Sequence, residues 1–81
     1  MKSIDLKIAD KMREQAELMN ELADTIDAAY SAAESHNRDG FDKYMYVTTL
    51  LGDKIDRVES RIKILKAMNK IANIIAYPFK M

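Results

Sequence analysis

The first long stretch of the chain, residues 3–36, carries apolar residues at spacings of three and four and contains neither glycine nor proline. These spacings place side chains on one face of an α-helix, and the rarity of helix breakers favours long helices over strands. The apolar positions are Ile8, Ala9, Met12, Ala16, Met19, Leu22, Ala23, Ile26, Ala29, Tyr30 and Ala33. We therefore expect a helix over about residues 3–36, capped by Ser3. Met12 and Met19 then belong to its core, and Gln15 is the polar member of the stripe.

A second apolar pattern of the same period begins near Asp39 or Phe41. Its stripe consists of Tyr44, Val47, Thr48, Leu51, Ile55, Val58, Ile62, Leu65, Met68, Ala72 and Ile75. Asp39 is followed three positions later by Asp42, which is typical of a capped first turn. Pro78 ends the pattern, because proline has no amide hydrogen to donate to a helix. We expect this helix over about residues 41–77.

Gly52 lies inside the second pattern, which passes through it without a change of phase and puts it on the outer face. A glycine inside a helix costs about 1 kcal/mol relative to alanine, which a long helix can absorb. We therefore expect one helix, continuous or kinked near Gly52. The alternative is that Gly52-Asp53 ends one helix and caps the next.

The polar residues between the two patterns, Ser35 to Gly40, are turn formers and predict a turn at about residues 36–40. The chain, residues 1–81, is thus expected to form a single all-α domain. Its predicted fold is a long antiparallel helical hairpin, similar to a coiled coil, with arms of about 50 Å at 1.5 Å per residue.

The end of the second helix carries more apolar surface than one neighbouring helix can cover. Nine of the thirteen residues 64–76 are apolar, and they occupy two flanks of the helix. A hairpin has no third element for the second flank, and soluble monomers seldom expose such a patch. We therefore expect a partner or oligomer interface that comprises Ile64, Leu65, Met68, Ile71, Ile74, Ile75, Tyr77 and Phe79.

Three kinds of partner fit this surface. Self-association into a four-helix bundle is the simplest, because burial of the isoleucines contributes several kcal/mol at about 25 cal/mol per Å². The first alternative is that a different helical protein binds this surface, with the present chain acting as a chaperone or an inhibitor. A membrane surface is the second, because basic residues accompany Tyr77 and Phe79 in an amphipathic arrangement.

Charge is distributed unevenly, although 13 basic and 13 acidic residues cancel. Residues 1–40 hold five basic and nine acidic side chains, whereas residues 41–81 hold eight basic and four acidic ones. Such opposite charges fit an antiparallel pair, but exposed ion pairs contribute only about 0.5 kcal/mol each. Nucleic acid is not expected as a partner, because the acidic first helix would repel phosphates.

No arrangement of side chains points to catalysis, a metal or a cofactor. The chain has no cysteine, which excludes a disulfide, a thiol nucleophile and a thiolate metal site. His36, the only histidine, lies in the predicted turn without the partners that a general base or metal ligand needs. We therefore expect a non-enzymatic protein. The absence of a signal-peptide profile and of a long apolar segment favours a cytoplasmic location.

Two segments resemble the second helix of the co-chaperones of type III secretion systems. They are residues 42–51 (DKYMYVTTLL) and residues 58–62 (VESRI). The length and layout are also similar to those of needle subunits, although that class has a proline in the turn, where this chain has residues 37–40 (NRDG). The resemblance implies a helical-hairpin chaperone or a structural subunit of a secretion-type assembly.

Overall fold

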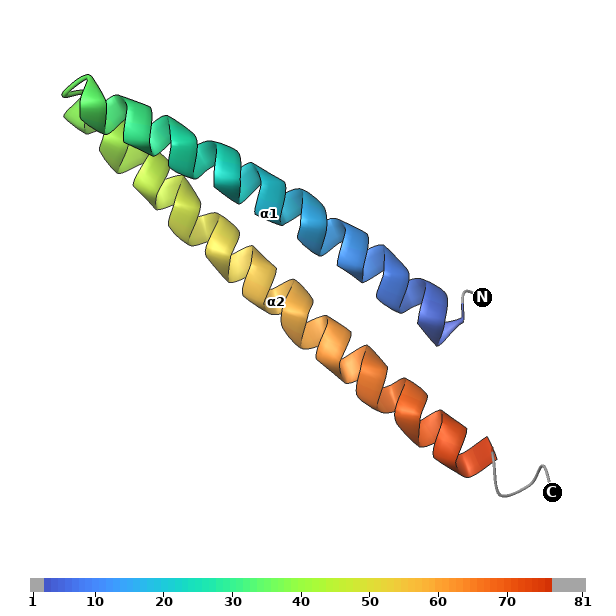
Figure 1. The fold of residues 1–81 in the computed structure, drawn as a ribbon. Helices are drawn as coiled ribbons and strands as arrows, with labels where there is room; N and C mark the ends of the chain where they lie inside the picture. Colours follow the sequence, from blue (N-terminus) through green and yellow to red (C-terminus); the bar gives the residue numbers. More distant parts are fainter. Residues whose placement is uncertain (1–2, 77–81) are drawn as a thin grey trace.

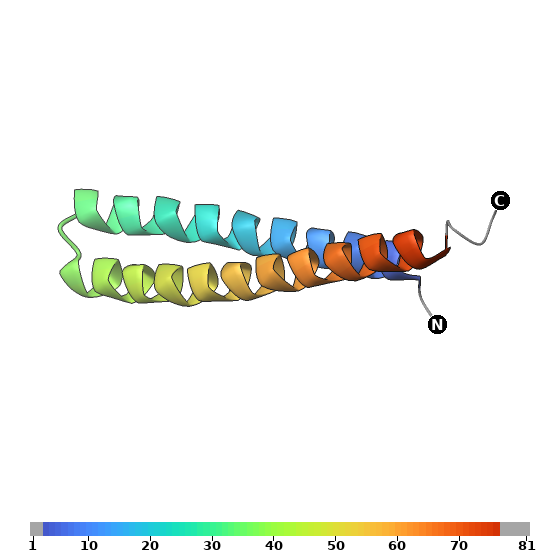
Figure 2. The ribbon, with the colours of Figure 1, turned by 90° about the horizontal axis from the view of Figure 1, so that it is seen from below.

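The computed structural model describes the backbone of residues 3–76 and the side chains of residues 3–73. It contains two helices that lie side by side and are joined at one end by a short turn (Figures 1 and 2). Helix α1 comprises Ile4–Glu34 and helix α2 comprises Arg38–Ala76. The predicted all-α hairpin is therefore confirmed. The stop expected at Pro78 lies outside the described residues.

The turn comprises residues 35–37 and is shorter than the turn predicted at about residues 36–40. His36 adopts a left-handed conformation with φ of 57°. The His36 amide donates to the carbonyl of Ala33 at 3.1 Å, and the Asn37 amide donates to that of Ala32 at 2.8 Å. These two bonds satisfy the last carbonyls of α1 in the pattern with which helices commonly end, although glycine is the usual residue at the left-handed position.

Both helix starts are capped by side chains. Ser3 accepts a hydrogen bond from the Leu6 amide at 3.3 Å, which confirms the predicted cap of α1. The cap expected at Asp39 is wrong, because α2 begins two residues earlier than that cap requires. Instead, Asn37 Oδ1 accepts from the Gly40 amide at 3.0 Å, and Asp39 lies in the first turn, where its charge suits the helix dipole.

The helices pack through residues that recur every seven positions. The buried side chains of α2 all belong to the predicted stripe, and they are Leu51, Ile55, Val58, Ile62 and Leu65. Met68, which the prediction placed in the same stripe, is 47% exposed. The facing residues of α1 form two columns, which are Ile8, Gln15, Leu22 and Ala29, and Lys11, Leu18, Thr25 and Ala32. The register is antiparallel, since Asn69 Nδ2 donates to Asp5 Oδ1 at 2.9 Å near the open end of the hairpin.

The predicted core of α1 is therefore partly wrong. Ile8, Leu22 and Ala29 do face α2, but Met12 and Met19 are 52% and 50% exposed. Lys11 and Leu18, each one position before a methionine, face α2 instead. The interface between the two helices accepts polar residues, since Lys11, Gln15 and Thr25 are half-buried in it. One neighbouring helix covers only one stripe, so the second apolar stripe of α1 is left at the surface.

Helix α2 continues through Gly52, as expected, and extends beyond the start of α1 (Figure 1). Because Asp5 lies beside Asn69, about two turns of α2 have no described residue of α1 opposite them. Ala72, expected in the core, is exposed for this reason. We call this segment, residues 71–76, the α2 overhang.

Candidate interaction surfaces

The apolar residues of α1 that do not face α2 form one continuous row, which we call the α1 stripe. It consists of Ala9, Met12, Ala16, Met19, Ala23, Ile26, Tyr30 and Ala33. Ile26 is 49% and Tyr30 is 69% exposed, so the hairpin leaves half or more of each side chain in water. The stripe contains no charged residue and spans about 36 Å at 1.5 Å per residue.

Gly52 of α2 lies beside the middle of the α1 stripe. The antiparallel register sets Asp5 against Asn69 and therefore places Gly52 level with Leu22 and Ala23. Gly52 follows the buried Leu51 and lies on the same broad side of the hairpin as the α1 stripe. A Cβ atom added to Gly52 would meet no atom within 4 Å. The hairpin itself therefore gives no reason for a glycine at this position.

The other broad side of the hairpin carries a second row, which we call the α2 stripe. Its exposed members are Leu50, Lys54, Arg57, Arg61, Ile64, Met68 and Ile71. Apolar side chains occupy both ends of this row, and three basic residues occupy its middle. Glu14 of α1 lines the same hollow as Lys54 and Arg57, together with Leu18 and Val58, so the acidic flank of α1 lies beside the basic part of the row.

The predicted interface residues are divided by the structure. Leu65 is only 3% exposed and packs against α1, so it belongs to the hairpin core and is not available to a partner. Ile64, Met68 and Ile71 are about half exposed and lie together on the α2 stripe. The side chains of Ile74 and Ile75, and the whole of Tyr77 and Phe79, lie outside the described residues.

The α1 stripe was missed in the sequence, where its members were assigned to the core. A signal was present, because apolar residues stand in adjacent pairs at Ile8-Ala9, Leu22-Ala23 and Ala29-Tyr30. Adjacent helical positions are about 100° apart and cannot both face one neighbouring helix. Such pairs therefore indicate a helix with two packing faces.

The ion pairs between described side chains run along each helix. Lys11 pairs with Glu14 at 2.9 Å, Arg13 with Asp10 at 3.1 Å, and Lys63 with Glu59 at 3.8 Å. All six side chains are substantially exposed, so these pairs add little to stability. The Lys11 pair explains how a lysine occupies the seam: its stem packs between the helices while its ammonium group reaches a carboxylate at the edge.

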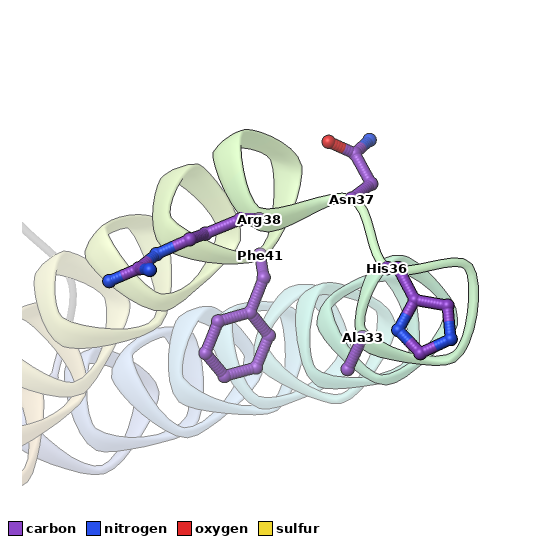
Figure 3. A pocket seen from close by; sticks show the side chains of 5 residues that line it. All are labelled: Ala33, His36, Asn37, Arg38 and Phe41. Atoms are coloured by element: carbon purple, nitrogen blue, oxygen red, sulfur yellow. The ribbon is translucent and has the colours of Figure 1, made fainter.

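A hollow of about 290 Å³ lies at the turn, lined by Ala33, His36, Asn37, Arg38 and Phe41. Figure 3 shows that Phe41 points from α2 toward α1, whereas Asn37 points away from the hollow. Binding sites for small molecules need several polar groups that converge on the ligand. The hollow lacks that arrangement, so we regard it as the end of the interface between the two helices, next to the turn.

Within residues 3–76 there is no group of three or more side chains able to hold a metal ion. In the same range, no helix is both long and apolar enough to cross a membrane. No family model, characterised protein or solved structure matches the chain. The resemblance to secretion co-chaperones thus rests on the two sequence segments alone, and the exposed stripes are the features from which a function is inferred.

Proposed function

We propose that this chain is a non-enzymatic interaction protein that assembles through the exposed faces of its helical hairpin. The simplest assembly is a pair of hairpins that form a four-helix bundle. The observation that carries this proposal is the exposure of the α1 stripe and of the apolar ends of the α2 stripe. Burial of the remaining half of a methionine or isoleucine side chain contributes about 1 kcal/mol. Several such residues on each face therefore supply a favourable free energy of association.

The energetics of the isolated hairpin support the same proposal. Seven residues of the described chain are buried, two of them are alanines, and no side chain is fully buried. Two-layer packing of this kind leaves a small core, and small domains commonly gain stability from oligomerisation. A partner that covers one broad side would turn the exposed stripe into core.

A second candidate function is the binding of a different protein, as by a chaperone or a subunit of a secretion-type assembly. The observation that favours it is the chemical difference between the two stripes. The α1 stripe is uncharged, whereas the α2 stripe combines apolar ends with Lys54, Arg57 and Arg61. If two copies pair through one stripe, the other stays free for a target with acidic and apolar residues.

The α2 stripe also has the composition of a helix that lies on an anionic membrane. Binding to vesicles rich in phosphatidylserine, weakened by added salt, is the result that this alternative requires. Absence of binding to such vesicles at low salt would remove it.

The proposal is tested by the absolute mass of the protein in solution, measured by light scattering over a hundredfold range of concentration. We expect twice the chain mass of 9.3 kDa, or a higher multiple, that holds over the upper part of the range. A mass of one chain at every concentration would refute self-association. The second candidate function would then be the one to pursue.

A further inference from the structure

We propose that the occupant of the α1 stripe is the α1 stripe of a second copy, packed antiparallel about a two-fold axis that passes close to Glu21. This inference deepens the proposed function and rests on it, because it assigns self-association to one face and one orientation. It leaves the α2 stripe exposed in the resulting dimer.

The order of residues in the middle of the α1 stripe carries the proposal, because large side chains there face small ones when the stripe is reversed on itself. Reversal about Glu21 sets Met19 against Ala23 and Ala16 against Ile26 of the other copy. It also sets Met12 against Tyr30, and the small residues at the two ends of the stripe, Ala9 and Ala33, against each other. Helix interfaces pack best when large side chains meet small ones.

Charges beside the stripe favour the same orientation. Arg13 and Asp27, both exposed, flank the α1 stripe. In the antiparallel arrangement Arg13 comes close to Asp27 of the second copy, whereas parallel helices would set each charge beside its own kind. Opposite charges at the edge of a helical interface select the orientation of the partner.

Helix α2 supports the same axis. The antiparallel α1 pairing also runs the two α2 helices past each other in opposite directions, with Gly52 near the crossing point. On this edge of α2, Asp42 then lies near Lys63 and Lys66 of the second copy, which are also exposed. The unoccupied space at Gly52 lets another backbone approach closely there.

The other two-fold arrangement of the same faces is less favourable. It would place the α1 stripe over the edge of α2 that carries Lys63, Lys66 and Lys70, and would thus cover charged groups with apolar ones. The area is sufficient for the antiparallel dimer. The broad side that holds the α1 stripe and the adjoining edge of α2 is 18 Å wide, and over the 36 Å of the stripe it offers about 650 Å² per copy, near the lower end of the range for stable complexes.

Thiol cross-linking tests the orientation, since the natural chain has no cysteine to interfere. The double variant Ala16→Cys/Ile26→Cys should form a covalent dimer on mild oxidation. Within one chain these positions are about 15 Å apart on a helix, too far for a disulfide. The single variants Ala16→Cys and Ile26→Cys should not cross-link, because each thiol lies about 15 Å from its own copy in the antiparallel dimer. Cross-linking of the single variants would show parallel helices and overturn the proposal.

Mass measurements on two matched variants test the face. Met19→Glu puts a charge at a half-exposed site of the α1 stripe, so the hairpin should stay helical while dimerisation weakens about tenfold or more. Ile71→Asp, on the α2 stripe, should leave the dimer intact. Gly52→Leu adds bulk where the hairpin has open space, and should retain the helix content while it weakens the dimer about tenfold or more.

The outcomes separate this proposal from the broader one. If Ile71→Asp dissociates the dimer and Met19→Glu does not, the self-association stands and its assignment to the α1 stripe is refuted. If the unaltered protein has the mass of one chain throughout, self-association itself is refuted, and this assignment with it.

Discussion

His36 has the least favourable backbone conformation of the described residues. Its φ of 57° lies in the left-handed region, which glycine enters freely and which costs other residues about 1 kcal/mol. The two backbone hydrogen bonds of the turn require this conformation but not a side chain, and the imidazole itself is exposed. The effect of residue 36 on stability should therefore depend on its backbone conformation and not on the chemistry of the imidazole.

Replacement His36→Gly should raise the free energy of unfolding by about 0.5–1 kcal/mol, because it relieves this conformation. Urea denaturation followed by circular dichroism at 222 nm measures the change. Ser35→Gly is the matched control. Ser35 has an ordinary φ of −88° and donates from its hydroxyl to the Ser31 carbonyl at 2.6 Å, so its replacement should lower stability. Equal effects of the two variants would contradict the account given for His36.

At the scale of the element, the two helices differ in how their apolar residues are used. Helix α2 places five large apolar side chains in the hairpin core and leaves others exposed, whereas the buried residues of α1 are two alanines, Ala29 and Ala32. Neighbouring residues of α2 should therefore respond differently to truncation. Leu65 is 3% and Ile64 is 50% exposed, although they are adjacent in the sequence.

Leu65→Ala should lower the free energy of unfolding by about 2–4 kcal/mol, because it leaves a cavity against α1. Ile64→Ala should change it by no more than about 0.5 kcal/mol in the Met19→Glu variant, at a concentration where light scattering gives that variant the mass of one chain. Chemical denaturation of both variants on that background measures the difference. A large loss for Ile64→Ala would mean that the α2 stripe is buried after all.

The sequence was sufficient to predict the hairpin, the cap at Ser3 and the packing face of α2. The buried row of α2 is free of charged residues, whereas the second row of that helix is interrupted by Lys54, Arg57 and Arg61, so the pattern favours one orientation of the helix. On α1 two apolar rows compete, and the more hydrophobic one, which contains Met12 and Met19, is the one left exposed. The choice depends on how the whole seam fits α2, including the accommodation of Lys11, and a residue-by-residue pattern does not contain that information. The pattern also could not show which residues α1 covers, so it predicted Leu65 as an interface residue, whereas the structure buries Leu65 against α1.

At the scale of the whole molecule, the structure is a narrow slab of 68 × 18 × 14 Å. Every residue of a two-helix slab is close to water, and folding buries a smaller share of the surface than in a globular domain. Stability should therefore depend strongly on whatever covers the broad sides. Association and folding become linked when the folded form alone pairs.

Thermal unfolding should accordingly depend on protein concentration. For a dimer, a hundredfold increase in concentration stabilises the folded state by about 2.7 kcal/mol, so the melting temperature should rise. Differential scanning calorimetry at several concentrations measures this rise. The Met19→Glu variant serves as the control and should melt at one temperature over the concentrations at which light scattering gives it the mass of one chain. A constant melting temperature of the unaltered protein would contradict the linkage.

The α2 overhang gives the proposed dimer a property that a single hairpin lacks. The two-fold axis near Glu21 sends the two overhangs to opposite ends, so that Ile71 of one copy lies about 54 Å from Ile71 of the other. Each overhang leaves apolar surface without an α1 residue opposite it. The dimer would thus be a bivalent clasp of fixed span. A target with one site would gain nothing from the second overhang, whereas a repetitive target whose sites are spaced to match would be held by avidity, through the high effective concentration of the second arm.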